Sequence, residues 1–437
     1  MPRKKRSNST GPIAAASHGA QEAAPAWEPA SKANPGKTPD GSAATNRAVQ
    51  RSRKRHKLKD GDFRGLKYFA LIDDLLKRLH NCATDRDRAG NRILHYDQYC
   101  ALILLFYFSP IVRSLRGIQE SSELKRIQKK LGCSRASLGS LSEAAHVFDS
   151  ELLRRMIPEL AAKIFPTAHG KDASALKNLT AVDGSLLPAL PKMVWALWRD
   201  EDHRAAKMHV HFDVFKGVPA DVTVTKGNGS EREQLRKMLQ AGRIYVEDRG
   251  YEDFQLFQDI VDAGSSFIAR VQDDVAYKVA EERPLTKEDQ AAGVVRDVVL
   301  KRLGTDHHKN VLKQPVRLVF VETDKLDADG KRNVLVLVTN LLDLPAELVA
   351  IGYKHRWAVE LFFRWLKCIL GCRHLLANNQ NGVEIQVYLG IIASLLISLW
   401  TGRKPTIRTL EMVQFYFCGW ATWGELQAHI QKLKEHA

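Results

Sequence analysis

The segment Leu179–Leu187 reads LTAVDGSLL, an apolar run that contains a single carboxylate, Asp183. At this point the hydrophobic pattern changes from helical spacing to the short apolar runs of strands. Further strands are expected at 207–215, 220–225, 243–247 and 266–271, and helices at 231–240 and 253–262. Three strands followed by helix, strand, helix and strand predict an α/β core with one mixed sheet.

Three parts follow this core along the chain. Residues 272–342 interrupt it with β-rich segments at 275–279, 294–302, 316–322 and 334–339. A long helix is then expected, with Asp343 and Pro345 at its start and Gly371 at its end. Residues 372–437 are predicted to be helical again.

The residues before the core, 62–165, are predicted to be helical throughout, with the strongly apolar segment 96–108 buried. The segment 115–148 predicts a basic helix that runs to Leu131, a short turn, and a second helix from Arg135. This is the outline of a helix-turn-helix, whose second helix would enter the major groove of DNA. Helical hairpins also occur in ordinary bundles, so the outline leaves both interpretations open.

The composition is that of a globular protein with an excess of positive charge. The 437 residues are 44% hydrophobic, and 66 Lys and Arg outnumber 50 Asp and Glu, for a net charge of +16 that a polyphosphate partner would favour. Residues 1–60 hold 13 basic and 4 acidic residues, a net +9, and are predicted to be a disordered basic tail. The rest of the chain is only mildly basic, so composition alone does not establish a nucleic-acid partner.

The sequence gives no sign of export or of a membrane partner. The N-terminus lacks an apolar signal segment, and the most apolar runs, Ala101–Phe108 and Gly390–Trp400, are too short to span a bilayer. The six cysteines are scattered without paired CxxC knuckles, so neither a disulfide framework nor a structural zinc site is expected. A soluble protein of the reducing cytoplasm is predicted.

The expected helix at 343–371 carries polar side chains at a regular spacing. Tyr353, Arg356, Glu360 and Lys367 lie at offsets that place them on one stripe about 60° wide, on a helix that is otherwise mostly apolar. Buried charges must pair with one another, bind a metal or face a charged ligand. Pairing among Arg356, Glu360 and Lys367 on a solvated face is the alternative.

Two aspartates favour a site. Asp183 lies within the first expected strand of the core, and Asp248 follows the strand at 243–247. Functional groups gather at the carboxyl ends of strands in α/β sheets. Three carboxylates from two strands and one helix can hold two divalent cations for in-line phosphoryl transfer, and Mg²⁺ prefers such oxygen ligands.

Together these residues resemble a known family. Tyr353-x2-Arg356-x3-Glu360-x6-Lys367 matches the Y-x2-R-x3-E-x6-K signature of the insertion-sequence-four family of DDE transposases. The segments VDGS, SEREQL and EDRGY stand in the matching order before it. The resemblance covers about 179–371.

The resemblance implies a fold and a set of catalytic residues. The fold would be an RNase H-like catalytic core at 170–271 and 343–371, interrupted by a β-rich insertion at 272–342. Carried over by position, the catalytic metal ligands would be Asp183, Asp248 and Glu360, which would hold two Mg²⁺ ions, with Mn²⁺ able to substitute.

The resemblance also implies DNA-binding residues: Tyr353, Arg356 and Lys367 would grip phosphates near the cleaved end. Arg249 could touch DNA as well, or it could pair with Glu247. Glu247 itself is not expected in the site, because adjacent strand residues point to opposite faces. His209 and His211 could approach the metals, but a structural role is favoured for both.

The implied activity is that of a DDE transposase, an endonuclease and strand transferase. Its partners would be double-stranded DNA, namely terminal inverted repeats and target DNA, and a second copy of the chain in a synaptic homodimer with contacts at 372–437. It would act at the nucleoid in the cytoplasm, cutting and pasting through hairpin ends. Relatives of this type place a tryptophan from the insertion in the gap left by a flipped base. The chain has no Trp between 199 and 356, which leaves Phe267, Tyr277 or Phe320 for that role and weakens the case for the hairpin step.

Two other functions fit parts of the pattern. One is a transposase-derived DNA-binding protein without catalysis, but all three carboxylates and Lys367 are present. The other is an RNase H-type nuclease that cleaves without joining, against which the stripe of Tyr, Arg, Glu and Lys argues.

Overall fold

The computed structural model describes residues 58–60, 70–82, 85–87, 90, 92–166, 171–189, 192–200, 203–308, 311–326, 330, 332–372 and 374–435. The tail predicted to be disordered, 1–60, lies outside the described residues except for its last three. Residues 57–437 form one compact unit, and the account below concerns that unit alone.

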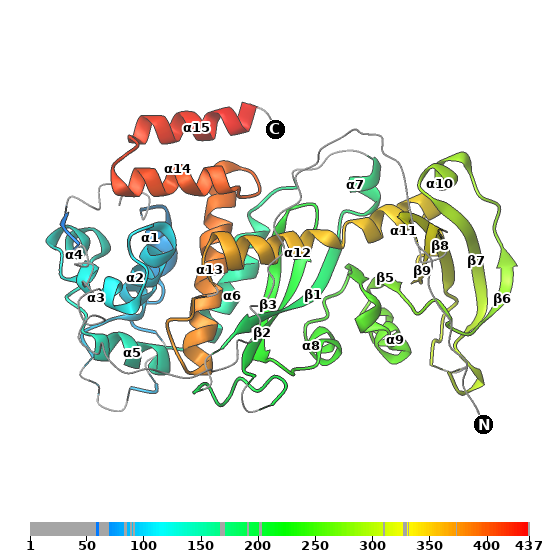
Figure 1. The fold of residues 1–437 in the computed structure, drawn as a ribbon, viewed down its shortest axis with the longest axis horizontal. Coiled ribbons are helices and arrows are strands. Elements are labelled where there is room, and N and C mark those ends of the chain that lie inside the picture. The colour runs from blue at the N-terminus through cyan, green and yellow to red at the C-terminus, as the bar shows by residue number, and fades with distance from the viewer. Residues whose placement is uncertain are drawn as a thin grey trace, which may run out of the picture. The chain divides into compact units, whose positions relative to one another are not determined.

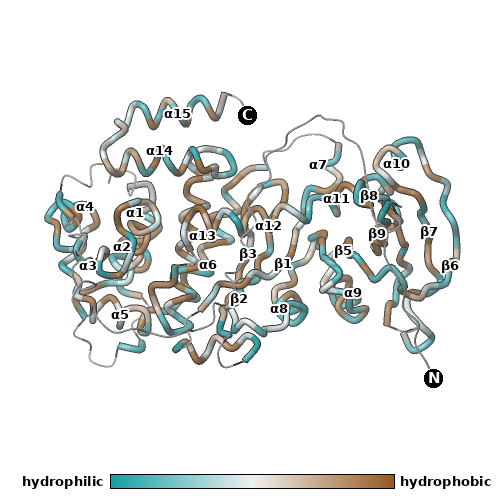
Figure 2. The backbone as a smooth tube through the Cα atoms, viewed as in Figure 1, coloured by the Kyte–Doolittle hydropathy of each residue, from teal (hydrophilic) through white to brown (hydrophobic). Residues whose placement is uncertain are grey.

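The N-terminal part of this unit is helical, as predicted. Its helices are α1 (Ala70–Lys77), α2 (Tyr96–Phe108), α3 (Leu115–Ser122), α4 (Lys125–Leu131), α5 (Leu138–Val147) and α6 (Ser150–Ala162). Helix α2 is almost wholly buried, as its composition predicts, and Figure 2 shows it among the most apolar parts of the chain. It ends at Ser109, whose extended backbone (φ −100°, ψ 120°) is what a residue before proline requires.

The single basic helix expected up to Leu131 is wrong, because α3 and α4 are separate. Leu124 is extended (φ −80°, ψ 128°), and its backbone breaks the helix. Around the break, the Ser122 hydroxyl accepts from the Ala136 N–H at 2.9 Å, and the Gln128 amide donates to the Ser122 carbonyl at 2.8 Å. These bonds satisfy the backbone groups that a continuous helix would have paired.

One mixed sheet runs through the rest of the unit (Figure 1). Its strands are β1 (Leu179–Pro188), β2 (Ala205–Asp213), β3 (Val218–Lys226), β4 (Ile244–Glu247), β5 (Ser266–Arg270), β6 (Tyr277–Glu282), β7 (Val294–Leu303), β8 (Arg317–Leu326) and β9 (Arg332–Thr339). In the described residues the strand order is β3-β2-β1-β4-β5-β9-β8-β7-β6. Strands β1, β4 and β5 are mutually parallel, and β2 and β3 continue antiparallel from β1. The predicted α/β class is confirmed, and this arrangement of β1–β5 is the RNase H-like one.

The β-rich insertion extends the same sheet. Strand β9 pairs antiparallel with β5, and β8, β7 and β6 follow outward. Short helices lie at α7 (Lys171–Ala175) and α10 (Lys287–Ala291), and α8 (Glu231–Lys237) and α9 (Phe254–Asp262) pack on the sheet. The pairing of β5 with β9 therefore joins the core strands β1–β5 to the insertion strands β6–β9 in one sheet.

Helix α13 (Gln380–Thr401) is the central helix of the helical part of the unit. Its 22 residues are long and apolar enough to cross a membrane, which exceeds the short run expected from the sequence. However, 89% of its most apolar window is buried inside the protein, against α2, α5, α6 and β3. It is therefore placed as a core helix. The chain ends with α14 (Ile407–Cys418) and α15 (Trp423–Glu435).

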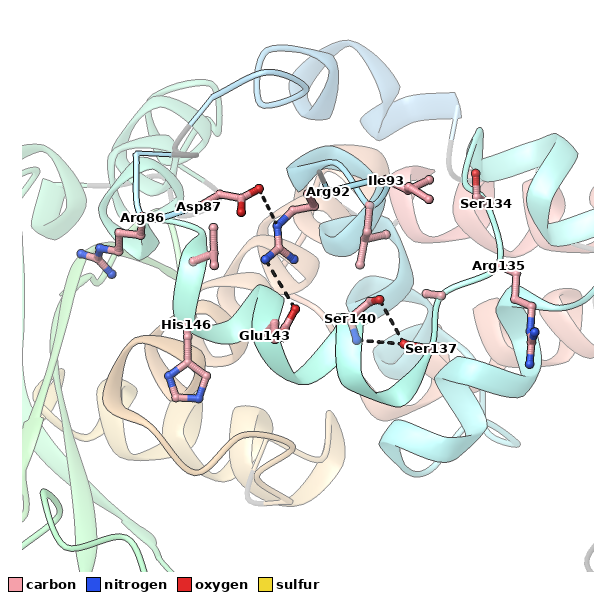
Figure 3. Close-up of a pocket in the computed structure, with 13 residues that line it drawn as sticks. Arg86, Asp87, Arg92, Ile93, Ser134, Arg135, Ser137, Ser140, Glu143 and His146 are labelled. Carbon is pink, nitrogen blue, oxygen red and sulfur yellow. Dashed lines mark hydrogen bonds and ion pairs between the residues drawn. The ribbon is translucent and has the colours of Figure 1, made fainter. Parts of the chain in front are cut away.

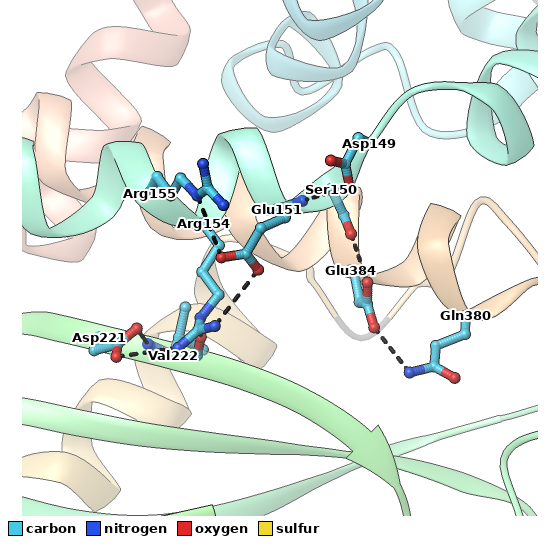
Figure 4. Close-up of polar contacts among 9 residues, drawn as sticks. All are labelled: Asp149, Ser150, Glu151, Arg154, Arg155, Asp221, Val222, Gln380 and Glu384. Atoms are coloured by element: carbon cyan, nitrogen blue, oxygen red, sulfur yellow. Dashed lines mark hydrogen bonds and ion pairs between the residues drawn. The ribbon is translucent and has the colours of Figure 1, made fainter. Parts of the chain in front are cut away.

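Helix α6 is fastened between α13 and the sheet by polar contacts (Figure 4). The Arg154 guanidinium donates to the Val222 carbonyl at 2.8 Å and to Asp221 Oδ2 at 3.2 Å, both on β3. At the start of α6, the Ser150 hydroxyl donates to Glu384 on α13 at 2.6 Å. The helical N-terminal part is thereby joined to the sheet edge.

The long helix expected up to Gly371 is wrong as a regular helix. It consists of α11 (Ala346–Lys354), α12 (Trp357–Arg364) and a π-helical turn at Trp365–Ile369. The N–H groups of Arg356, Ala358 and Val359 donate to carbonyls three residues back, so the helix tightens at the junction.

A change of packing partner accounts for that junction. Helix α11 packs on β5 so closely that a Cβ on Gly352 would lie 2.9 Å from Ile268 Cδ1. Helix α12 instead buries Val359 and Phe362 against β1 and β2, with the Phe362 and Phe212 rings 5.3 Å apart. One uniform helix cannot serve both surfaces, so its pitch changes between them.

A buried ion pair connects the insertion to α11, and it yields a stability prediction. The Arg317 guanidinium, 1% exposed, donates to Asp297 Oδ2 at 2.9 Å and to the Leu344 carbonyl just before α11. Replacing Asp297 by Ala leaves a buried charge without its partner. We expect Asp297→Ala to lower the free energy of unfolding by about 3–5 kcal/mol, measured by urea denaturation.

The control for this experiment is Arg332→Ala, which breaks the exposed Arg332–Glu322 pair on the neighbouring strands. That variant should lose less than about 1 kcal/mol. Equal losses from both variants would contradict a special role for the buried pair.

Candidate active site

The pairing of β1 with β4 places two carboxylates side by side. Ala181 pairs with Val246 in parallel register, Asp183 and Asp248 each follow two residues further on, and the two carboxyls interact electrostatically. Residues two apart in a strand share a face, and neighbouring strands lie about 5 Å apart. The sequence prediction that these aspartates come together agrees with this placement.

The next strand adds a cation to the row. Val246 pairs with Ile268 of β5, and the same offset of two brings Arg270 beside Asp248. Its guanidinium also acts electrostatically on Tyr353. Sequence reasoning missed Arg270, although its position at the end of a third parallel strand was the signal that could have found it.

Helix α12 brings an arginine and a glutamate over this row. Arg356 Nη2 lies 2.7 Å from Glu360 Oε1, with both side chains largely shielded from solvent. Burial alone would lower the pKa of Arg356, but the bond to Glu360 and the nearby Tyr353 and Asp248 raise it above its ordinary value. Of the alternative pairing among Arg356, Glu360 and Lys367, only the Arg356–Glu360 pair is present, and Arg356 also interacts with Asp183 and Asp248.

Lys367 reaches the sheet from the π-helical turn. Its ammonium donates to the Ser185 hydroxyl at 2.9 Å and lies 3.5 Å from the Leu186 carbonyl. Ser185 shares a face of β1 with Asp183, two residues before it. The π-helical turn thus places Lys367 at the same strand end as the carboxylates.

Asp183 is the most perturbed carboxyl of the row. Burial raises its pKa most, and Asp248 and Glu231 raise it further. The Gly184 N–H, which donates to Asp183 Oδ1 at 2.7 Å, and Arg356 oppose the shift, and the net pKa is about 7. The neighbouring groups that favour ionisation therefore offset only part of the cost of ionising the Asp183 carboxyl.

Glu231 is a fourth carboxylate that sequence reasoning did not assign to the site. It is the first residue of α8, and its Oε1 lies 3.1 Å from Lys207 Nζ on β2. The SEREQL segment was the available signal. Its proximity to Asp183 depends on the packing of α8 against β1, which no spacing in the sequence gives.

The remaining candidates next to Asp248, Glu247 and Arg249, differ in burial. Glu247 is fully buried while Asp248 is partly exposed, so the two point to opposite faces as predicted. Neither carboxylate oxygen of Glu247 has a hydrogen-bond partner, so the expected alternative of an Arg249–Glu247 pair is wrong. Arg249 is exposed.

The two histidines of β2 are buried and make contacts within the protein, which fits the structural role favoured for them. His209 is hydrogen-bonded to Thr225 Oγ1 at 2.9 Å, and the His211 ring packs against Tyr245. Burial lowers the pKa of each to about 3, so both remain neutral.

Two aromatic residues differ in their access to a ligand. Phe267, considered for the gap left by a flipped base, is fully buried and stacked on Phe257. Trp357, the first residue of α12, is 56% exposed, and the Arg356 guanidinium lies 6.0 Å from its ring centre. An exposed aromatic face therefore does stand beside the site.

The donor set fits a hard divalent cation in chemistry, but the carboxylates hold other partners here. Among the described residues no three acidic, His or Cys side chains are arranged to hold a metal ion. Glu360 binds Arg356, Asp183 accepts from Gly184, and Asp248 Oδ1 accepts from the Gly250 N–H at 2.8 Å. All the donors are oxygens, as Mg²⁺ prefers, and the pKa of Asp183 is raised mainly by burial and further by the nearby carboxylates of Asp248 and Glu231.

A separate pocket of about 750 Å³ lies in the helical N-terminal part, beside the start of α5 (Figure 3). Arg92 points into it between Asp87 and Glu143, at 3.5 and 3.9 Å. The Arg92 guanidinium is thus flanked by two carboxylates of opposite charge, whereas Asp183 lies near the like-charged Asp248 and Glu231.

Comparison with known proteins identifies relatives of one kind. The family model described as "Transposase DDE domain" matches residues 174–396, about half of the chain. A putative transposase of Sinorhizobium fredii is 30% identical over 45% of this chain and 53% of its own length. The chain thus spans about half of that relative.

Other relatives match over longer spans. A probable transposase for an insertion sequence element of Geobacillus stearothermophilus is 26% identical over 65% of this chain and 73% of its own length. A putative insertion-sequence transposase of Synechocystis is 20% identical over 72% and 88%. The piggyBac transposase, solved as a synaptic complex with hairpin DNA, aligns over 85% of each chain at 11% identity and a TM-score of 0.37.

The raised pKa of Asp183 predicts a pH-dependent stability. Without divalent ions the folded state holds the Asp183 proton up to about pH 7, whereas the unfolded chain releases it near its ordinary value of 3.8. The stability that this proton provides is complete below pH 3.8 and is lost as the pH rises through 7. Asp183→Asn does not titrate, so in EDTA its stability relative to the parent should rise by roughly 2 kcal/mol between pH 5 and pH 8.

Thermal and urea unfolding at several pH values would measure this difference. Asp343→Asn, at an exposed position of the same part of the chain, should show a constant difference from the parent. A constant difference for Asp183→Asn would mean that this carboxyl ionises normally.

Proposed function

The chain belongs to the family of transposase DDE domains, and on that premise we propose that it cuts DNA at the ends of a mobile element and joins those ends to target DNA. The proposal is supported by the parallel pairing of β1 with β4, which ends two residues before Asp183 and Asp248, and by the electrostatic interaction of Asp183 with Asp248 and Arg356. Carboxylates held together against their own repulsion need a compensating cation.

Asp183, Asp248 and Glu360 are the residues that would hold two divalent cations, Mg²⁺ or Mn²⁺. Bound there, the ions supply activation of the attacking oxygen and stabilisation of the leaving oxygen in an in-line displacement at phosphorus. The residues of the chain position these groups and provide the negative charge.

The Arg356–Glu360 pair supports a coupling between metal and DNA binding. Without a ligand, Arg356 Nη2 and Glu360 Oε1 pair with each other at 2.7 Å. A cation at Glu360 and a phosphate at Arg356 would replace both halves of that pair together. An arginine released beside a DNA backbone forms the strong charge-assisted bonds that phosphates favour.

The grip on DNA is assigned to side chains around the carboxylates. Tyr353, Arg356 and Lys367 would bind phosphates near the cleaved end, with exposed Arg249 at the rim. The exposed Trp357 ring offers a surface on which an unpaired base could stack.

The finer assignments extend this proposal. The chain would be of the insertion-sequence-four type, with catalytic residues at 170–271 and 343–371 and a hairpin step in its reaction. The helical part at 62–165 would contact double-stranded DNA at the terminal repeats, and 372–437 would support a synaptic homodimer. The site of action would be the nucleoid in the cytoplasm.

The test uses the full chain, Mg²⁺ and the inverted repeats that bracket its gene. Nicking at the repeat ends followed by joining to a second duplex supports the proposal. Binding without nicking would point to a DNA-binding protein without catalysis, and nicking without joining to a nuclease. Either result would overturn the transposase assignment.

Glu360→Ala should retain binding to the repeat ends and reduce their cleavage to background, because the carboxylate is lost while the phosphate-binding residues remain. Gel-shift and nicking assays on the same DNA would measure both properties. The exposed Glu411 on α14 provides the control Glu411→Ala, which should cleave as the parent does. Cleavage by Glu360→Ala at the parental rate would exclude Glu360 from the site.

Lys367→Ala should weaken end binding and flatten its salt dependence. Losing one phosphate contact lowers the slope of log K against log salt by about one. Filter binding at several salt concentrations would measure the slope, with Lys301→Ala on exposed β7 as the control. An unchanged slope would mean that Lys367 makes no phosphate contact.

A further inference from the structure

Glu231 lies against Gly184, the residue that follows Asp183 on β1. A Cβ built on Gly184 would lie 2.5 Å from Glu231 Oε1 and 3.0 Å from its carboxyl carbon. Any side chain at 184 would displace this carboxylate. The absence of one brings Glu231 against the backbone immediately after Asp183.

The start of α8 is tied to β2 and to the turn that follows β4. Lys207 of β2 binds Glu231 at 3.1 Å, and its ammonium also donates to the Gly229 carbonyl at 3.3 Å. The next residue, Arg232, donates to the Gly250 carbonyl at 3.0 Å, in the turn whose N–H binds Asp248. These contacts hold the Glu231 side chain and the start of α8 at the site.

We infer that Glu231 is a fourth carboxylate of the cation site, and that it pairs with Lys207 until divalent ions bind beside Asp183. This inference rests on the proposed function and adds a residue to it. Glu231 would be a positioning and charge-balancing residue, and the reacting phosphate would remain with Asp183, Asp248 and Glu360.

Charge supports the assignment. Two divalent cations bring four positive charges, and three carboxylates supply three negative ones. The electrostatic influence of Glu231 already extends to Asp183 and to the buried Tyr251 hydroxyl. A half-buried carboxylate this close adds the fourth negative charge without any change in the backbone.

Lys207 makes the inference distinguishable from a simple structural ion pair. If Glu231 serves only to pair with Lys207, removing either partner should weaken folding and leave cation affinity unchanged. If Glu231 serves the cations, Lys207 competes with them for its carboxylate. Loss of Glu231 and loss of Lys207 would then change the cation affinity in opposite directions.

The experiment measures Mn²⁺ binding to the full chain without DNA, by electron paramagnetic resonance and by calorimetry. We expect Glu231→Gln to weaken Mn²⁺ binding by about tenfold or more, and Lys207→Gln to strengthen it. Glu233→Gln, at an exposed position two residues further along α8, should bind Mn²⁺ as the parent does. Thermal unfolding in EDTA would verify that each variant is folded.

The outcomes separate this inference from the function on which it rests. A parent chain that binds no Mn²⁺ and cleaves no repeat ends would overturn the proposed function itself. A parent that binds and cleaves while Glu231→Gln binds Mn²⁺ equally well would overturn only the role of Glu231. Unchanged Mn²⁺ affinity in both Glu231→Gln and Lys207→Gln would show that the pair is structural, and parallel losses of affinity would contradict competition between Lys207 and the cations.

Discussion

The parallel pairing of β1 with β4 fixes two like charges next to each other, and the rest of the site is arranged around that conflict. The register is held by side chains on both faces, since Val182 and Tyr245 are buried beneath the sheet and Ala181 and Val246 above it. A slip of one residue would turn every one of them to the wrong face. The carboxylate of Asp183 therefore cannot move away from Asp248, and its pKa is raised first by burial and then by Asp248 and Glu231.

The surrounding cations reduce this conflict without removing it. Arg356 is shared between Glu360 and the two aspartates, and Lys207 is paired with Glu231. Such a site is less stable than an apolar one of the same size, as expected where function rather than folding selects the residues. In the proposed function, ligands would carry the missing charges, cations for the carboxylates and phosphates for the arginine and lysine.

Much of this could be read from the sequence because it depends on local patterns. The strands of the core, the aspartates near their ends and the offsets from Tyr353 to Lys367 are all encoded within short segments. What could not be read depends on contacts between distant segments. The tightening of the helix at Arg356 follows from a change of packing partner, and the places of Arg270 and Glu231 follow from strand register and from the packing of α8.

The continuity of the sheet gives the insertion a mechanical relation to the site. Strand β9 pairs with β5 up to Arg270, and α11 packs across β5, β7 and β8 before it reaches Tyr353. The buried Arg317–Asp297 pair is bonded to the carbonyl of Leu344, just ahead of α11. A displacement of the insertion would thus be carried through α11 to the helix that holds Glu360. Because protein interiors are closely packed, α11 is the direct structural link between the insertion and the helix that holds Glu360.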